Sequence, residues 1–500
     1  MKFLFPAIAI LLHSLSSLVL LGHPHHHHHH AHDDEEEPLH LEDAIATALL
    51  NNFQINRSFY LAHIAESNLI SSLSVFDPQQ VTSTNLRYDD ASASPSTTRS
   101  SVSTSTVKSF SSGTSLDLAL GARQQNNAPE DEDWNTFLRL GLRQPLLEGA
   151  GRLINTADIL RSFRERDASL LRLQASAIRI IANTVEAYRT LAFQIERRQV
   201  FLLSLGIAES LLEETITRRD LGVATDVDVL RARIGVADRQ QAIIQLEEQI
   251  GNASDALLTI MGILDPDAAT RLEVVPLPVE EDLPLLGREE VFALAHAFDP
   301  DTKVRRFDLI NRELDFQIAR NQGLPALDLV ASVDFSGSDS GLSSSTQNTL
   351  QRDRESWALG LELRFPWNPR NDRARTDRAR FNRTLAALDL EEREQSLEES
   401  LRRLWRRVET SQELIQIRTI SVQLAEETFS EEQARFESGL STFRNVSEQQ
   451  RELDLSRLAL LEARLDLLNA TSRLEELSGI LPSRYGYDWT FLSALLRHRL

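Results

Sequence analysis

The chain has 500 residues, of which 41% are hydrophobic and 25% are charged, and its formal net charge is −21. That charge argues against a nucleic-acid binder, which needs a basic surface, and the density of charge argues against a helical membrane protein. Because cysteine is absent, a lipid anchor on cysteine, a thiolate metal site and a cysteine nucleophile are excluded. The sequence has no phosphate-binding glycine loop, no dinucleotide motif and no His-Glu-x-x-His, so we expect neither an enzyme nor a cofactor.

The N-terminus begins with Lys2 followed by a mainly apolar stretch to Leu21. A basic start before an apolar core predicts a secretory signal peptide over residues 1–22, and an uncleaved anchor helix is the alternative. Beyond Leu21 no run approaches the ~18 apolar residues of a membrane-spanning helix. If the chain crosses a bilayer, it must therefore do so with strands.

Residues 23–38 combine histidines with a run of acidic residues and are predicted to be a flexible segment. Imidazoles beside carboxylates are able to capture Zn, Ni or Cu ions. The alternatives are an engineered tag or a low-complexity segment without function. The weak metal-binding candidates are His25, His26, His27, His28, His29 and His30.

The rest of the chain is an internal duplication. At an offset of 247 residues, Glu42 falls on Glu289 and Pro78 on Pro325. Offsets of 221 and 217 then bring 138–145 onto 359–366 and Gly222 onto Gly439. The offset changes only across Ser/Thr-rich stretches. We therefore predict two copies of one unit, at 39–264 and 288–482, joined by a proline-rich linker at 265–287 and followed by a tail at 483–500.

Each copy has the same predicted order of elements. A helix (41–75 and 288–322) ends before Asp77-Pro78 or Leu324-Pro325 and is followed by strands at about 79–144 and 326–365. A long helix (155–221 and 372–438), a break at Gly222 or Gly439, and a return helix complete hairpins at about 155–262 and 372–479. A helix of about 65 residues would be about 100 Å long, which predicts a coiled coil and not a globular core. Its apolar positions step at three to five residues: Ile180, Val185, Tyr188, Leu191, Ile195 and 202–205.

The strands alternate strictly between large apolar residues and small or polar ones. Such a segment of nine or ten residues fits a tilted strand of an outer-membrane barrel, with lipid on one face and water on the other. A soluble antiparallel sheet with one face on a core gives the same pattern. The candidate lipid-facing residues are Leu138, Leu140, Leu142, Trp357, Leu359, Leu361 and Leu363.

The first copy contains about four extended segments where two are expected: 81–88, 102–110, 115–122 and 135–143. Ser112-Gly113 is predicted to turn the middle pair. The extra hairpin either enlarges a barrel or decorates it outside the membrane, and the polarity of 104–109 favours decoration. The Ser/Thr/Asp-rich stretches 90–106 and 336–355 are predicted to be exposed loops.

The duplicated order of helix, strands, long helix, glycine turn and return helix resembles the TolC-like outer-membrane efflux proteins. The segment 140–151 resembles their strand-to-helix junction, and 220–230 and 437–442 resemble their hairpin tips. The resemblance implies a mainly helical fold, with long coiled-coil hairpins that form a periplasmic α-barrel and strands that contribute to a transmembrane β-barrel. It further implies a homotrimer with a 12-stranded barrel in outer-membrane lipid, a periplasmic adaptor, an inner-membrane pump and passive export.

In that family, acidic residues six and nine positions after the second tip glycine ring the periplasmic gate. Here those positions hold Asn445 and Glu448, and Asp228 holds the matching position after Gly222. The neutral Asn445 predicts a ring that binds cations less strongly. The alternative for Asp228 and Glu448 is a simple charge at a helix N-terminus.

The resemblance also implies that the hairpin tips, with Gly222, Thr225, Gly439 and Thr442, dock the adaptor. Thr225 and Thr442 are expected to cap the return helices. The alternative function is that of a periplasmic coiled-coil adaptor or a scaffold without a membrane barrel, although such an adaptor would have one hairpin and not two full copies.

Overall fold

The computed structural model describes residues 38–91, 94–127, 130–263, 272, 274–276 and 286–487. The predicted signal peptide, the histidine tract and most of the linker and tail lie outside these residues. The helices of the first copy are α1 (Leu41–Asn51), α2 (Phe53–Leu73), the 3-10 turn η1 (Ser74–Phe76), α3 (Arg152–Asn155), α4 (Ala157–Asp220) and α5 (Asp226–Met261). Those of the second are α6 (Arg288–Phe298), α7 (Pro300–Gln322), α8 (Leu342–Leu350), α9 (Arg370–Glu437), α10 (Phe443–Ser478) and α11 (Leu481–Arg484).

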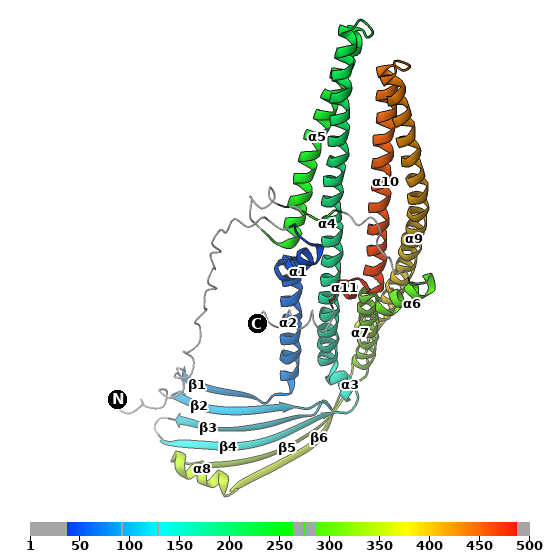
Figure 1. Ribbon diagram of the computed structural model, residues 1–500. Helices are drawn as coiled ribbons and strands as arrows, with labels where there is room; N and C mark the ends of the chain where they lie inside the picture. Colours follow the sequence, from blue (N-terminus) through cyan, green and yellow to red (C-terminus); the bar gives the residue numbers. More distant parts are fainter. Residues whose placement is uncertain are drawn as a thin grey trace, which may run out of the picture. The chain divides into compact units, whose positions relative to one another are not determined.

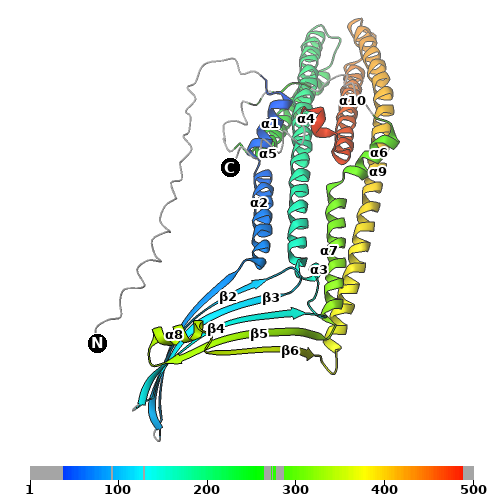
Figure 2. The same cartoon turned by 90° about the horizontal axis from the view of Figure 1, so that it is seen from below.

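The long helices α4 and α9 carry 64 and 68 residues, and each turns back into a return helix of 36 residues. The two hairpins lie side by side, with the sheet at the opposite end of α4 and α9 from the hairpin tips (Figure 1). Next to the sheet, α2, α4, α7 and α9 run as neighbours in that order, and towards the tips α5, α4, α10 and α9 do so (Figure 2). Each chain therefore supplies four helical columns along most of its length.

The predicted helices 41–75 and 288–322 were wrong in one respect, because each is two helices. The breaks fall at equivalent residues, Asn52 and Asp299. The side chain of Asn52 accepts hydrogen bonds from the backbone N–H groups of Gln54 and Ile55, and Asp299 accepts one from Thr302. Both residues therefore cap the second helix of their pair, and at the second break Pro300 occupies the first helical turn.

The main core lies where α1, α4, α5 and α10 meet. Of the apolar positions predicted on the first long helix, Ile180, Val185, Tyr188 and Leu191 are buried. The hydroxyl of Tyr188 donates to the carbonyl of Leu39 (2.7 Å), so α4 holds the start of the described chain. Nearer the tip, however, Leu202 and Leu203 are exposed.

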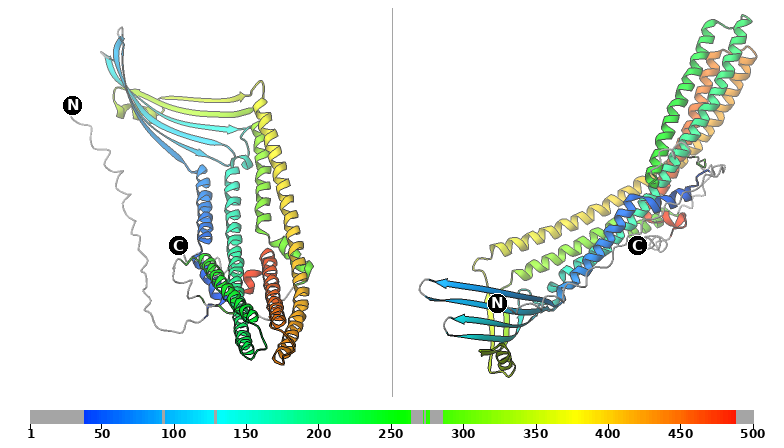
Figure 3. Two further views of the ribbon diagram at one scale, coloured as in Figure 1. Left: turned by 90° about the horizontal axis from the view of Figure 1, so that it is seen from above. Right: turned by 90° about the vertical axis from the view of Figure 1, so that its left-hand side faces the viewer.

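The strands β1 (Gln79–Ala91), β2 (Ser94–Ser109), β3 (Ser115–Asn127), β4 (Glu130–Pro145), β5 (Ala326–Asp339) and β6 (Arg354–Arg364) form one antiparallel sheet in the order β1-β2-β3-β4-β5-β6. The four extended segments of the first copy are confirmed, and Gly113, at φ +92°, makes the predicted turn. The strands of both copies meet where β4 pairs with β5. Figure 3 shows this sheet and the two hairpins from two further sides.

The extra hairpin is part of the same sheet, because β2 pairs with β3 over the whole length from Thr97 to Ser109 and the sheet has no interruption. Whether it enlarges a barrel or decorates it outside the membrane stays a prediction. The loop predicted over 90–106 is wrong, since most of it belongs to β1 and β2. The loop predicted over 336–355 contains the end of β5 and the helix α8. Among the described residues, no helix combines the length and the apolar character that crossing a membrane requires.

Candidate conduit and docking surfaces

One face of the sheet is apolar across β3, β4, β5 and β6. Residues paired across neighbouring antiparallel strands point to the same face, and the pairing places Leu118, Leu140, Val333 and Trp357 in one row. We call this the leucine face. All seven residues predicted to face lipid lie on it, namely Leu138, Leu140, Leu142, Trp357, Leu359, Leu361 and Leu363. Leu140 and the four residues of β6 are exposed.

The opposite face carries most of the charged residues of the sheet, and we call it the charged face. Arg143 donates to Asp328 (2.5 Å) and Arg139 pairs with Asp334, so two ion pairs cross the junction of β4 and β5. Glu362, on β6, lies opposite Asp328 and is paired with Arg364 (2.5 Å). A sheet with one apolar and one charged face fits a wall between lipid and water.

The helix α8 packs on the leucine face at the end of the strands that is distant from the long helices. Thr136 shares hydrogen bonds with Ser345 (3.1 Å) and Thr349 (2.6 Å) of α8. The backbone of α8 approaches Gly337 so closely that a Cβ there would lie 2.5 Å from the carbonyl oxygen of Ser345. A glycine inside a strand indicates that another backbone approaches closely, and Gly337 was the one feature of the sequence that could have predicted this contact.

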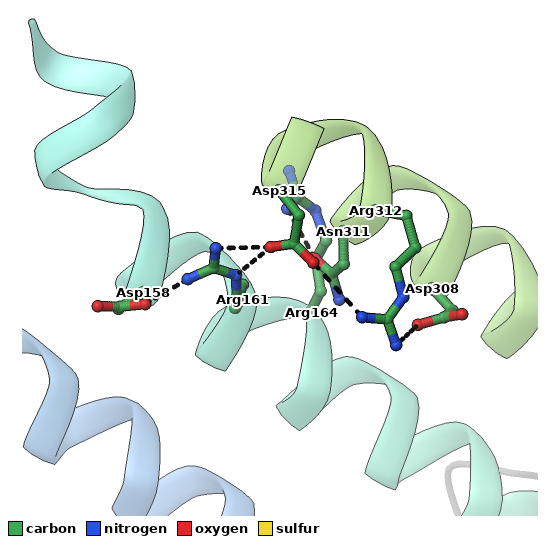
Figure 4. A network of polar contacts seen from close by, with 7 residues as sticks. All are labelled: Asp158, Arg161, Arg164, Asp308, Asn311, Arg312 and Asp315. Atoms are coloured by element: carbon green, nitrogen blue, oxygen red, sulfur yellow. Dashed lines mark hydrogen bonds and ion pairs between the residues drawn. The ribbon is translucent and has the colours of Figure 1, made fainter. Parts of the chain in front are cut away.

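The two copies are joined above the sheet by a polar network between α4 and α7 (Figure 4). Arg161 donates to Asp315 through Nε (3.1 Å) and Nη2 (2.6 Å), and Arg164 donates to Asn311 (3.0 Å). Arg161 also pairs with Asp158, and Arg312 lies between Asp308 and Asp315 (both 3.4 Å). The network fixes the helices that lead out of β4 and into β5, which supports the alignment of these strands.

A buried ion pair secures α7 to α9. Asp299 binds Arg393 through two hydrogen bonds (3.0 and 2.7 Å) while it caps α7. Burial alone would raise the pKa of Asp299, but Arg393 and the hydrogen bonds from Thr302 hold that pKa below its ordinary value. The carboxylate is therefore ionised at neutral pH.

The first hairpin tip turns at Gly222, whose φ is +76°, and the return helix begins after Thr225. Thr225 and Asp228 form a reciprocal capping box, in which the N–H of Asp228 donates to Thr225 (3.2 Å) and the N–H of Thr225 donates to Asp228 (3.1 Å). The side-chain hydrogen bond from Thr225 is the main cause of the lowered pKa of Asp228. The capping prediction for Thr225 is confirmed.

The second tip has the same backbone with different capping. Gly439 has φ +75°, and the N–H of Leu440 bonds the carbonyl of Arg435 as Val223 bonds Arg218 in the first tip. Thr442 occupies the capping position but makes no capping hydrogen bond with its side chain, so that prediction was wrong. Asn445 stands where Asp228 stands in the first copy, and its amide instead donates to Ser441 (3.3 Å).

The tips are held together and present apolar side chains. The guanidinium of Arg218 lies 4.0 Å from the centre of the Phe436 ring and donates to the Phe436 carbonyl at the end of α9. Leu221, Val223 and Leu440 are each more than 70% exposed. A Cβ at Gly222 or Gly439 would meet no atom within 4 Å, so these glycines are required for their backbone conformation and not for lack of space.

The candidate gate residues lie in the first turns of the return helices. Asn445 and Glu448 are exposed and one turn apart on α10, whereas Asp228 is partly buried and is 3.7 Å from Arg231. Arg231 occupies in the first copy the position of Glu448 in the second. Of these three positions, only Glu448 is thus an exposed carboxylate, because Asn445 is neutral and Asp228 is close to Arg231.

Sequence reasoning missed a buried polar cluster between the hairpins. Ser204 of α4 donates to Asp454 of α10 (2.5 Å), and it accepts hydrogen bonds from Arg239 (2.8 Å) and Gln450 (3.1 Å). Burial raises the pKa of Asp454, although Ser204 and the nearby Arg239 and Arg457 act in the opposite direction. The described residues contain no group of three or more histidine, aspartate or glutamate side chains placed to hold a metal, and the histidine tract lies outside them.

A family model described as outer membrane efflux protein matches residues 293–480. No curated protein has a significant match to the chain. Among solved structures, the outer-membrane channel OprN is 17% identical with a TM-score of 0.68, and the match covers 88% of this chain and 89% of OprN. The CmeC outer membrane channel of Campylobacter jejuni is 15% identical with a TM-score of 0.66 and 90% coverage of both chains. The MtrE outer membrane channel of Neisseria gonorrhoeae, in its open state, is 17% identical with a TM-score of 0.63 and coverage of 88% and 89%. The resemblance to TolC-like channels and the fold class are confirmed.

Proposed function

We propose that this chain, whose second half matches the outer membrane efflux protein family and whose fold is that of outer-membrane channels, is the outer-membrane duct of a tripartite export system. It conducts exported compounds passively from a periplasmic adaptor and an inner-membrane pump to the exterior, and it catalyses no reaction. A homotrimer of the chain in the outer membrane places the helical columns around one periplasmic bore.

The observation that carries this proposal is the two-faced sheet at the end of the long helices. Beyond the end that α8 covers, the leucine face is apolar without being covered by a core, which a soluble sheet would not tolerate. The charged face, with its arginines and aspartates, requires contact with water. Both requirements are met if the leucine face contacts acyl chains and the charged face lines the pore.

The hairpin tips support the docking part of the proposal. Their exposed Leu221, Val223 and Leu440 offer an apolar surface, and Gly222, Thr225, Gly439 and Thr442 set the turns that present it. An adaptor with a complementary apolar groove would bury these side chains. Asp228, Asn445 and Glu448 then surround the periplasmic entrance, where Asn445 and Arg231 weaken the attraction for cations.

The proposal is tested in a strain that lacks its own outer-membrane channel but carries the adaptor and the pump. The full chain is expected to fractionate with the outer membrane, to migrate as a heat-sensitive trimer in detergent, and to restore export. Recovery of the protein in the soluble periplasmic fraction would favour the adaptor or scaffold function instead. A chain that reaches the outer membrane as a trimer but exports nothing would refute only the role in efflux.

A further inference from the structure

We infer that eighteen strands close the outer-membrane pore of this protein, six from each of three copies, with β1 of one copy paired to β6 of the next. The inference rests on the proposed function. It goes beyond that function because it assigns the hairpin of β1 and β2 to the pore wall, and it therefore predicts a pore wider than one of twelve strands.

The sheet is continuous from β1 to β6. Thr82 pairs with Thr104, Thr104 pairs with Leu120, and Leu120 pairs with Leu138, so β1 and β2 continue the register of β3 and β4. The turn that joins β2 to β3 lies at the helical end of the sheet, where a Cβ on Gly113 would be 2.6 Å from the carbonyl oxygen of Gly149. This close contact anchors β2, together with β3, at the strand-to-helix junction.

The two edge strands of the sheet, β1 and β6, are open. All residues of β6, and those of β1 from Gln79 to Tyr88, are exposed, and neither strand contains proline. A long, open edge strand without proline is a template for pairing with another chain. Because strands alternate in direction across the sheet, β6 and the β1 of a second copy meet antiparallel. Between Gln79 and Leu86 β1 carries no charged residue, so it presents no like charge to Glu362 or Arg364.

The charged face of the sheet continues across β1 and β2. Arg87 and Arg99 are directly paired, and they lie on the charged face, as does Arg123. The other side of β1 and β2 continues the leucine face and carries uncharged residues such as Thr82, Thr84, Val102 and Thr104. Its one lysine, Lys108, is at the helical end and donates to the carbonyl of Phe76.

The six strands and the four helical columns of one copy cover arcs of similar width. Four neighbouring helices at about 8–10 Å between axes span roughly 32–40 Å. Six strands about 4.8 Å apart and tilted by about 40° span roughly 38 Å of circumference. Four strands would span only about 25 Å. Six strands per copy therefore continue the helical tube at nearly constant width, with a barrel of about 36 Å backbone diameter.

The pairing is tested by cross-linking of introduced cysteines, for which the cysteine-free chain gives no background. Ser83→Cys on β1 is combined in turn with Ser356→Cys, Ala358→Cys and Gly360→Cys on β6, all on the charged face. The matched control combines Ala119→Cys on β3 with the same β6 positions. A thiol cross-linker of about 8 Å is applied to outer-membrane vesicles that contain the assembled full chain, since strands three apart in one sheet are separated by about 14 Å.

The expected result is a ladder of covalent dimers and trimers with at least one pair that includes Ser83→Cys, and none with Ala119→Cys. Cross-links from Ala119→Cys, or none from Ser83→Cys at any of the three positions, would overturn the inference while a heat-sensitive outer-membrane trimer still supports the duct. A ladder from Ser83→Cys that stops at the covalent dimer, for an assembly that is itself dimeric, would also overturn it, because twelve strands would then close the pore. If no outer-membrane oligomer forms at all, the proposed function fails first.

Discussion

At the scale of single residues, the most consequential groups are the buried charges that connect helices. Asp299 is 4% exposed and serves at once as a helix cap and as the partner of Arg393. At Asp454 the balance is reversed. Burial raises its pKa, and the hydrogen bond from Ser204 and the nearby arginines offset only part of that shift. The two aspartates are therefore expected to respond differently to substitution and to pH.

Replacing Asp299 with alanine should destabilise the protein by about 3 kcal/mol, because it leaves Arg393 without its main partner and α7 without its cap. Asp301→Ala is the matched control, since that carboxylate also lies near Arg393 (3.4 Å) but is more exposed than Asp299. Thermal unfolding of the detergent-extracted protein, followed by loss of helical circular dichroism, measures both. Equal melting temperatures for the two variants would show that the pair contributes little.

Asp454→Asn should stabilise the protein at pH 7. A raised folded-state pKa means that the folded protein holds the proton of Asp454 more tightly than the unfolded chain does, so ionisation costs stability above that pKa. As the pH falls through the raised pKa, the wild-type carboxyl becomes neutral and the advantage of the variant should disappear. Melting temperatures at pH 7 and near pH 4 test this. An advantage that grows on acidification would contradict the sign of the shift.

At the scale of elements, β6 carries the clearest prediction because its alternate residues face opposite environments. Leu361→Arg places a charge on the leucine face and should cost about 2–4 kcal/mol if that face contacts the membrane interior. Gly360→Arg is the matched control, since it puts the same side chain on the charged face, where a Cβ meets no atom within 4 Å. Urea unfolding in lipid vesicles compares them. Equal stabilities would move β6 out of the bilayer.

The hairpin tips are predicted to act in docking and not in assembly. A β-branched residue strains a backbone at φ near +75°, so Gly222→Val and Gly439→Val should each distort the tip and reduce export at least severalfold. Trimer formation in the outer membrane should persist. Gly251→Ala, on the helical part of α5 with no atom near its Cβ, is the control that should export normally. Unchanged export by both tip variants would refute their role.

At the scale of the whole molecule, the duplication and the alternation of the strands made the fold predictable from the sequence. Both are repeating patterns that can be read directly from the sequence. The tip turns were predictable because a glycine occupies the same place in the two copies. The two helix breaks were missed although Asn52 and Asp299-Pro300 are ordinary capping signals, because the apolar period continues across them. The helix α8 was missed because packing on Gly337 and Thr136, and not its own composition, stabilises it.

What the sequence did not predict are the contacts between distant segments. The polarity of 104–109 suggested a decoration, whereas pairing with β3 incorporates the hairpin into the sheet. The capping of the tips was predictable at Thr225 and not at Thr442, where Asn445 has replaced the acid that completes the capping box in the first copy. The cluster around Asp454 involves three helices, and no local pattern reveals such a site.

The central claim is that the leucine face contacts lipid while the helices surround a water-filled bore. Cryo-electron microscopy of the full chain, extracted from outer membranes in detergent, tests it most directly. We expect a threefold tube with a detergent belt around the strands, Leu140 and Leu361 turned towards that belt, and a continuous central channel. A particle that buries these leucines in its own interior, with neither belt nor channel, would contradict it.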